Sequence, residues 1–123
     1  MHKILVIEDD IDVTKVLKKR LVDNGYDVIT ANEPTEGLRL AHGEKPDLIL
    51  LDLKLPTGGG LSVLRSLKMS SETREIPVVV VTGVKRVEIK DQVLKEGALA
   101  YIEKPYEPQE LMETVRGILS KKT

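Results

Sequence analysis

The chain of 123 residues has no cysteine, tryptophan or phenylalanine, and it has only three tyrosines. Without cysteine it has no disulfide, no thiolate zinc site, no iron–sulfur cluster and no cysteine nucleophile. The scarcity of aromatic rings argues against functions that stack bases or flavin rings on aromatic side chains. The core must be aliphatic, because leucine, valine and isoleucine supply 40 of the 50 apolar residues.

The chain also lacks an excess of one charge and any long aliphatic run. Its 20 acidic and 19 basic residues leave a net charge of −1, which provides no broad basic field for nucleic acid. The longest runs of leucine, isoleucine and valine have four residues, too short for a membrane span or a signal-peptide core. We therefore expect one soluble, cytoplasmic domain over residues 1–123, with neither a membrane nor a nucleic acid as a direct partner.

Three aliphatic runs are typical of strands that are buried on both faces, as in a parallel sheet. They cover residues 4–7, 48–51 and 78–81. Two weaker strands are predicted over residues 26–31, which alternate, and residues 99–102.

Helical patterns alternate with these strands. The first helix has an apolar stripe formed by Val13, Val16, Leu17 and Leu21, and it is expected to stop at Gly25. The other predicted helices cover about 34–43, 61–67, 85–96 and 111–119, the last with Pro108 near its start. Five strand–helix repeats predict a three-layer α/β/α sandwich with a five-stranded parallel sheet.

Polar side chains that can carry chemistry follow four of the five predicted strands. Ligands of open parallel sheets bind outside the carboxyl ends of the strands, so these positions are candidate functional sites. They are Glu8, Asp9 and Asp10 after the first strand, Asp52 after the third, Thr82 after the fourth and Lys104 after the fifth. We expect these side chains to meet at one edge of the sheet.

The acidic members of this group indicate a metal site. Several carboxylates at one edge repel each other unless a cation joins them. Oxygen ligands suit Mg²⁺ or Mn²⁺ rather than zinc, and Glu8, Asp9 and Asp52 are the predicted set. Asp10 immediately precedes a predicted helix and is interpreted as its N-cap.

Asp52 follows a fully apolar strand, where it either caps the next turn or acts as an activated carboxylate that forms an aspartyl phosphate. Phosphoryl transfer needs a metal for the developing charge and donors for the phosphoryl oxygens. Lys104 offers an ammonium group and Thr82 a hydroxyl. Jointly with the acidic residues, they indicate a phosphorylation site.

The order and spacing of these residues resemble the receiver (CheY-like) domain of bacterial two-component response regulators, over residues 3–121. The matching segments are Ile4-Leu-Val-Ile-Glu-Asp9, Asp47-Leu-Ile-Leu-Leu-Asp52, Leu55-Pro56 with Gly60-Leu61, residues 78–82 and residues 97–105. The resemblance implies a flavodoxin-like fold with strand order 2-1-3-4-5. It also implies a signalling switch that a sensor histidine kinase or phosphotransfer protein phosphorylates, rather than a multiple-turnover enzyme.

Carried over residue by residue, the resemblance implies that Asp52 is the phosphoacceptor. Thr82 and Lys104 would then hold the phosphoryl oxygens. Asp9 and Asp52 would bind Mg²⁺ through their side chains. The remaining protein contacts would come from Glu8 through water and from the backbone carbonyl of Lys54.

The resemblance also implies an output mechanism. Tyr101 matches the rotating aromatic residue of the family, and Lys104-Pro105 matches its usual cis peptide. When Thr82 moves toward the phosphoryl group, Tyr101 would turn inward and change the surface of the fourth helix, fifth strand and fifth helix. That surface would control a protein partner, an output domain or a second copy of the chain. The alternative is that Tyr101 is a fixed residue whose hydroxyl faces water.

Several residues depart from the family pattern and leave the dephosphorylation rate open. Gly83 stands where alanine is usual, and Lys54 and Val84 stand at two positions expected to face the mouth of the site. The glycine-rich stretch 57–60 lacks the Gly-Lys-Ser/Thr ending of a phosphate loop, so we interpret it as a flexible connection.

Three other functions compete with the switch. A flavodoxin-like electron carrier would need hydroxyl and amide donors after its first strand, where this chain has acids. An aspartyl phosphohydrolase would need a second acid two residues after Asp52, where Lys54 stands. A constitutive interaction module would not need the complete acidic, hydroxyl and lysine set.

Overall fold

The computed structural model describes residues 1–54 and 59–121. The strands are β1 (Lys3–Ile7), β2 (Asp27–Ala31), β3 (Leu48–Leu51), β4 (Val78–Thr82) and β5 (Ala100–Glu103). The helices are α1 (Ile11–Asp23), α2 (Pro34–Glu44), α3 (Gly59–Met69), α4 (Val87–Lys95) and α5 (Pro108–Leu119). Within these described ranges, the helices are too short or too polar to cross a membrane.

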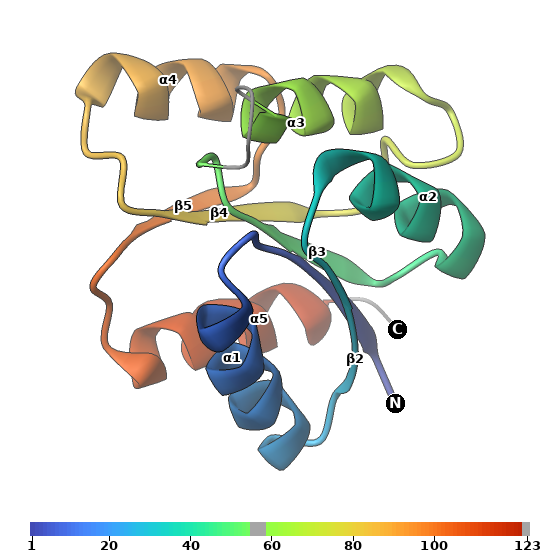
Figure 1. Ribbon diagram of the computed structural model, residues 1–123, viewed down its shortest axis with the longest axis vertical. Helices are drawn as coiled ribbons and strands as arrows, with labels where there is room; N and C mark the ends of the chain where they lie inside the picture. The colour runs from blue at the N-terminus through green and yellow to red at the C-terminus, as the bar shows by residue number, and fades with distance from the viewer. Residues whose placement is uncertain (55–58, 122–123) are drawn as a thin grey trace.

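The strands form one parallel sheet in the order β2-β1-β3-β4-β5. Helices α2, α3 and α4 cover one face of this sheet, and α1 and α5 cover the other (Figure 1). The predicted three-layer sandwich and its strand order are therefore confirmed. The two weaker strands were each predicted to start one residue too early, since β2 starts at Asp27 and β5 at Ala100.

Two aliphatic cores explain the continuous apolar runs. Successive side chains of a strand point to opposite faces, so every residue of a strand covered on both sides is buried. On β1, Leu5 and Ile7 enter the core beneath α2, α3 and α4, whereas Ile4 and Val6 enter the core beneath α1 and α5. The sheet is therefore packed between two cores.

The buried face of α1 differs from the predicted apolar stripe. Val16 is 58 % exposed, whereas the inward face consists of Thr14, Leu17 and Leu21. Positions 14, 17 and 21 follow the three- and four-residue spacing of one helical face, and Val16 lies off that face. The apolar stripe was misplaced because a threonine occupies the buried position nearest the start of the helix.

Helix α4 has the weakest attachment to the core. Val93 is its one buried residue, and the helix is shorter than the predicted 85–96. Its C-terminal end is fixed by Glu96, which forms a two-pronged ion pair with Arg65 of α3. Gly97 then leaves the helix with a positive φ of 113°, a conformation that favours glycine.

The flexible connection predicted over residues 57–60 is wrong for its last two residues, which begin α3. Gly59 and Gly60 are buried residues of the helix itself. A Cβ at Gly60 would lie 2.3 Å from the Cα of Leu53, so the two backbones are in direct contact. The Leu55-Pro56 motif and residues 57 and 58 of the glycine-rich stretch lie outside the described residues.

Candidate functional site

Sheet pairing fixes the backbone where the polar side chains begin. One residue beyond β1, the Glu8 amide donates to the Ala31 carbonyl at 3.0 Å. The Asp52 amide donates to the Ile7 carbonyl at 3.0 Å, which aligns the ends of β3 and β1. The Lys104 amide donates to the Thr82 carbonyl at 2.9 Å and does the same for β5 and β4. Residues far apart in sequence are thereby held at one edge of the sheet.

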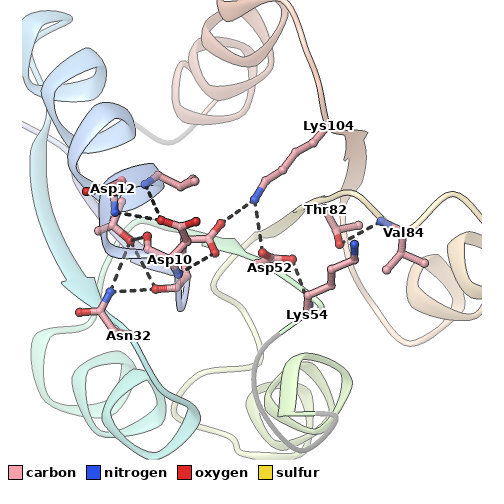
Figure 2. A network of polar contacts seen from close by, with 11 residues as sticks. Asp10, Asp12, Asn32, Asp52, Lys54, Thr82, Val84 and Lys104 are labelled. Atoms are coloured by element: carbon pink, nitrogen blue, oxygen red, sulfur yellow. Dashed lines mark hydrogen bonds and ion pairs between the residues drawn. The ribbon is translucent and has the colours of Figure 1, made fainter.

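Lys104 joins the two buried carboxylates of this edge (Figure 2). Its Nζ lies 2.6 Å from Oε1 of Glu8 and 3.3 Å from Oδ2 of Asp52. Glu8 is 4 % exposed and Asp52 is 5 % exposed. Buried carboxylates require such a counter-charge, because desolvation without a partner is costly.

The two carboxylates have opposite pKa shifts. Burial raises the pKa of Glu8 to about 7, although the hydrogen bond from Lys104 acts against this shift. Burial also acts to raise the pKa of Asp52, but the Lys54 amide and the charge of Lys104 outweigh it and lower that pKa. Burial acts to lower the pKa of Lys104, and its hydrogen bond to Glu8 reverses the direction. Asp52 is therefore ionised at neutral pH and Lys104 is charged.

Three carboxylates lie close enough to share one cation. Ligand oxygens of Glu8, Asp9 and Asp52 all lie within 4.8 Å of one another. All ligands in this set are hard oxygen donors, and the carboxylate of Asp9 is exposed. Such a set suits an ion that keeps several waters, such as Mg²⁺. The Lys54 amide donates to Oδ1 of Asp52 at 3.0 Å, while the role of its carbonyl stays a prediction.

Thr82 and Tyr101 are connected through one residue of the loop after β4. Thr82 is fully buried, and its hydroxyl oxygen accepts a hydrogen bond from the Val84 amide at 3.3 Å. The Val84 carbonyl accepts a hydrogen bond from the Tyr101 hydroxyl. In this structure the tyrosine hydroxyl is therefore bonded to the loop, while the choice between a rotating and a fixed Tyr101 stays a prediction.

Lys54 and Gly83 face each other at the mouth of the site. A Cβ at Gly83 would lie 3.4 Å from Nζ of Lys54, and Figure 2 shows the lysine extending beside Thr82. On the other side, Tyr106 lines a small internal cavity together with Asp52 and Lys104. The Lys104–Pro105 peptide is cis, as predicted.

Two supporting residues were missed by the sequence predictions. The Asn32 side chain, at the end of β2, donates to the Glu8 carbonyl at 2.8 Å. The Thr14 hydroxyl donates to the Asp10 carbonyl at 2.9 Å. Asn32 had a detectable signal, because it follows a strand at the same edge of the sheet, whereas Thr14 had none. The predicted N-cap is confirmed, since the Asp10 carboxylate accepts from the amides of Asp12 and Val13.

Comparison with known proteins gives matches over almost the whole chain. A family model described as the response regulator receiver domain matches residues 4–116. The DNA-binding dual master transcriptional regulator RpaA of Synechocystis is 36 % identical over 119 residues, which are 97 % of this chain and 49 % of that protein. The chain spans about half the length of the curated relatives it matches.

Solved structures give the same result. A CheY-like response regulator receiver domain protein from Methanospirillum hungatei aligns with a TM-score of 0.91 and 31 % identity, covering 98 % of this chain and 95 % of that one. The receiver domain of the sensor histidine kinase PA1611 from Pseudomonas aeruginosa aligns with a TM-score of 0.88 and 25 % identity, covering 97 % and 98 %. That structure is described with a magnesium ion coordinated in its active site cleft.

Proposed function

This chain belongs to the response regulator receiver domains of two-component systems, and on that premise we propose that it is a switch phosphorylated on Asp52. The observation that carries the proposal is the environment of this carboxylate. Asp52 is buried and ionised, lies 3.3 Å from the Lys104 ammonium, and shares an oxygen cluster with Glu8 and Asp9. A nucleophile, a cation and candidate metal ligands are thus concentrated at one point.

Phosphoryl transfer at this point balances as a simple displacement. A carboxylate oxygen of Asp52 attacks the phosphorus of a phosphohistidine, so that an O–P bond forms and the P–N bond breaks. The electron pair of the broken bond stays on the imidazole nitrogen. Lys104 then donates to a phosphoryl oxygen. The Thr82 hydroxyl accepts from Val84, so its own proton is available for a second phosphoryl oxygen.

Glu8, Asp9 and Asp52 are the proposed ligands of Mg²⁺ or Mn²⁺, with the Lys54 carbonyl as a further ligand. Such an ion supplies positive charge for the oxygens of the transferring group. Stoichiometric phosphorylation, with slow loss of the group, fits one acceptor per chain. We therefore propose a switch over residues 1–123 rather than a multiple-turnover enzyme.

The proposed output follows from the two hydrogen bonds of Val84. Its amide donates to Thr82 and its carbonyl accepts from Tyr101. A shift of Thr82 toward a phosphoryl group would break the first contact and move the segment that leads into α4. The surface of α4, β5 and α5 would then change for a protein partner, an output domain or a second copy of the chain.

The proposed kinase approaches the same edge from the side of α1. Ile11 is 57 % exposed at the start of α1, next to the acidic residues. The Pro105 side of the site is also exposed. An exposed aliphatic residue beside the acceptor provides an apolar contact for a helical histidine kinase or phosphotransfer protein.

Mass spectrometry after incubation with acetyl phosphate and Mg²⁺ tests the proposal. The wild-type chain should gain one phosphoryl group, and Asp52→Asn should gain none, because an amide is a poor nucleophile. Asp27→Asn is the control, since Asp27 is exposed at the opposite edge of the sheet. Equal labelling of Asp52→Asn and wild type would refute the assignment. Multiple turnover would favour a hydrolase, bound flavin an electron carrier, and a wild-type chain without label a constitutive module.

A further inference from the structure

We propose that Thr14 and Asn32 are positioning residues for the carboxylate of Asp9. They hold the backbone carbonyls of Glu8 and Asp10, the residues on either side of it. The inference rests on the proposed function, because it assigns these two residues to the proposed metal site.

Asp9 depends on its backbone for its position. Among residues 1–54 and 59–121, its carboxylate makes no hydrogen bond or ion pair, and the residue is exposed. Glu8 differs, because Lys104 and the Asp10 amide both contact its side chain. The direction of the Asp9 side chain is therefore set by the peptide groups next to it.

Two side-chain donors serve the two carbonyls, and the Asp10 carbonyl also accepts from the Thr14 amide at 3.0 Å. The Thr14 hydroxyl oxygen lies 2.9 Å from the Asp10 carbonyl oxygen and 3.3 Å from that of Glu8. A hydroxyl has one proton and serves one acceptor fully. Asn32 supplies the second donor, because its Nδ2 lies 2.8 Å from the Glu8 carbonyl oxygen. Its other proton faces the Thr14 hydroxyl oxygen at 3.4 Å.

The side-chain protons of Thr14 and Asn32 each donate to a different oxygen, and these hydrogen bonds join three elements. Asn32 follows β2 and its side chain points toward the Asp10 segment (Figure 2). Thr14 lies on α1, and the carbonyls belong to the connection from β1 to α1. Thr14 is buried, so water does not easily replace its hydroxyl. Glu8 is buried, so its carbonyl must find another donor when Asn32 is replaced, and the connection then moves. The Asp10 carbonyl keeps the Thr14 amide as a donor at 3.0 Å and loses one of its two hydrogen bonds when the Thr14 hydroxyl is removed.

The chain provides matched controls for both residues. Thr73 is buried and its hydroxyl donates to the Leu67 carbonyl at 2.7 Å. Thr73→Val therefore repeats the chemistry of Thr14→Val away from the acidic cluster. Asn24 donates to the Arg20 carbonyl at 2.8 Å, so Asn24→Ala matches Asn32→Ala. Thr14→Ser keeps the hydroxyl and should restore wild-type behaviour.

Calorimetric titration with Mg²⁺ measures the expected effect. Thr14→Val and Asn32→Ala should each weaken Mg²⁺ binding roughly tenfold, as residues that orient metal ligands do. Thr73→Val, Asn24→Ala and Thr14→Ser should bind Mg²⁺ like the wild type. Carbonyl carbon resonances of Glu8 and Asp10 should also shift in metal-free Thr14→Val. In an Asp9→Asn background, Thr14→Val should have no further effect on Mg²⁺ affinity.

The experiment distinguishes a failure of the proposed metal site from a failure of the positioning role alone. A wild-type chain that bound no Mg²⁺, or that bound it equally after Asp9→Asn, would refute the proposed metal site and this inference with it. If Asp9→Asn weakened Mg²⁺ binding while Thr14→Val behaved like Thr73→Val, only the positioning role would be overturned. The same holds if the carbonyl resonances of Glu8 and Asp10 did not move.

Discussion

Gly60 is a residue at which two backbone segments are in direct contact. A Cβ there would lie 2.6 Å from the Leu53 carbonyl oxygen and 2.7 Å from that of Asp52. These atoms are backbone and cannot rotate away, so a side chain must displace the segment that carries Asp52. We predict that Gly60→Ala destabilises the protein by about 2 kcal/mol, because overpacking forces the backbone to shift. Urea denaturation measures this change.

Gly117→Ala provides the control for that substitution. Apart from its chain neighbours and the backbone of α5, no atom of residues 1–54 and 59–121 lies within 4 Å of a Cβ at Gly117. Replacing an unconstrained helical glycine with alanine should stabilise the protein by about 0.5–1 kcal/mol. The explanation of Gly60 would be wrong if both variants changed stability in the same direction.

Residues that carry chemistry were easier to predict than residues that support them. Asp52 and Lys104 each follow a strand, Thr82 is the last residue of one, and the carboxyl ends of parallel strands share one edge. The role of Asn32 depends on a hydrogen bond to a residue 24 positions away, and that of Thr14 on a buried hydroxyl within an apolar helix face. The sequence signals only that Asn32 follows a strand, and it gives no signal for Thr14.

At the scale of elements, α4 has few core contacts and an ion pair at its C-terminal end. Two nitrogens of Arg65, on α3, donate to the carboxylate of Glu96. Val93 is the one buried residue of α4. We predict that Arg65→Ala increases amide hydrogen exchange throughout α4 several-fold and leaves the melting temperature almost unchanged. An exposed ion pair contributes little to global stability, but here it holds a helix with few core contacts.

Lys19→Ala is the comparison for this variant. It removes an exposed ion pair within α1, from Lys19 to Asp23, on a helix with three buried residues. Exchange in α1 should not change. If α4 of Arg65→Ala exchanged as slowly as in the wild type, the ion pair would not be what fixes this helix.

Elements differed in how well periodicity predicted them. The buried central strands were confirmed, because an unbroken aliphatic run between two polar positions has no other stable place in a small domain. The helices were found but not their exact faces, as Val16 shows. A helical wheel locates an apolar face only when that face is apolar throughout, and Thr14 interrupts this one.

At the scale of the whole molecule, folding stability is linked to the proton on Glu8. Burial raises its pKa from 4.5 to about 7 in the folded protein. Between these values the unfolded chain releases a proton that the folded chain keeps, so stability falls as pH rises through this window. In metal-free buffer we predict a loss of about 3 kcal/mol from pH 4.5 to pH 8.

Glu8→Gln and added Mg²⁺ separate the causes of this pH dependence. The glutamine variant has no carboxyl group at position 8, so its stability should be nearly flat over the same range. Mg²⁺ binds the ionised carboxylates, and its stabilising effect on the wild type should therefore grow with pH. A wild-type slope that persisted in Glu8→Gln would show that another group is responsible.

The placement of the few tyrosines makes the protein its own optical probe. With no tryptophan, the near-ultraviolet absorption and fluorescence come from three phenol rings. Two of them flank Lys104: Tyr101 bonds to the Val84 carbonyl, and Tyr106 lines a cavity with Asp52. We therefore expect phosphorylation at the acidic edge to change the surroundings of two of the three chromophores. Circular dichroism near 280 nm can therefore follow the switch in unlabelled protein. A core rich in aromatic residues would have obscured the signal of these tyrosines.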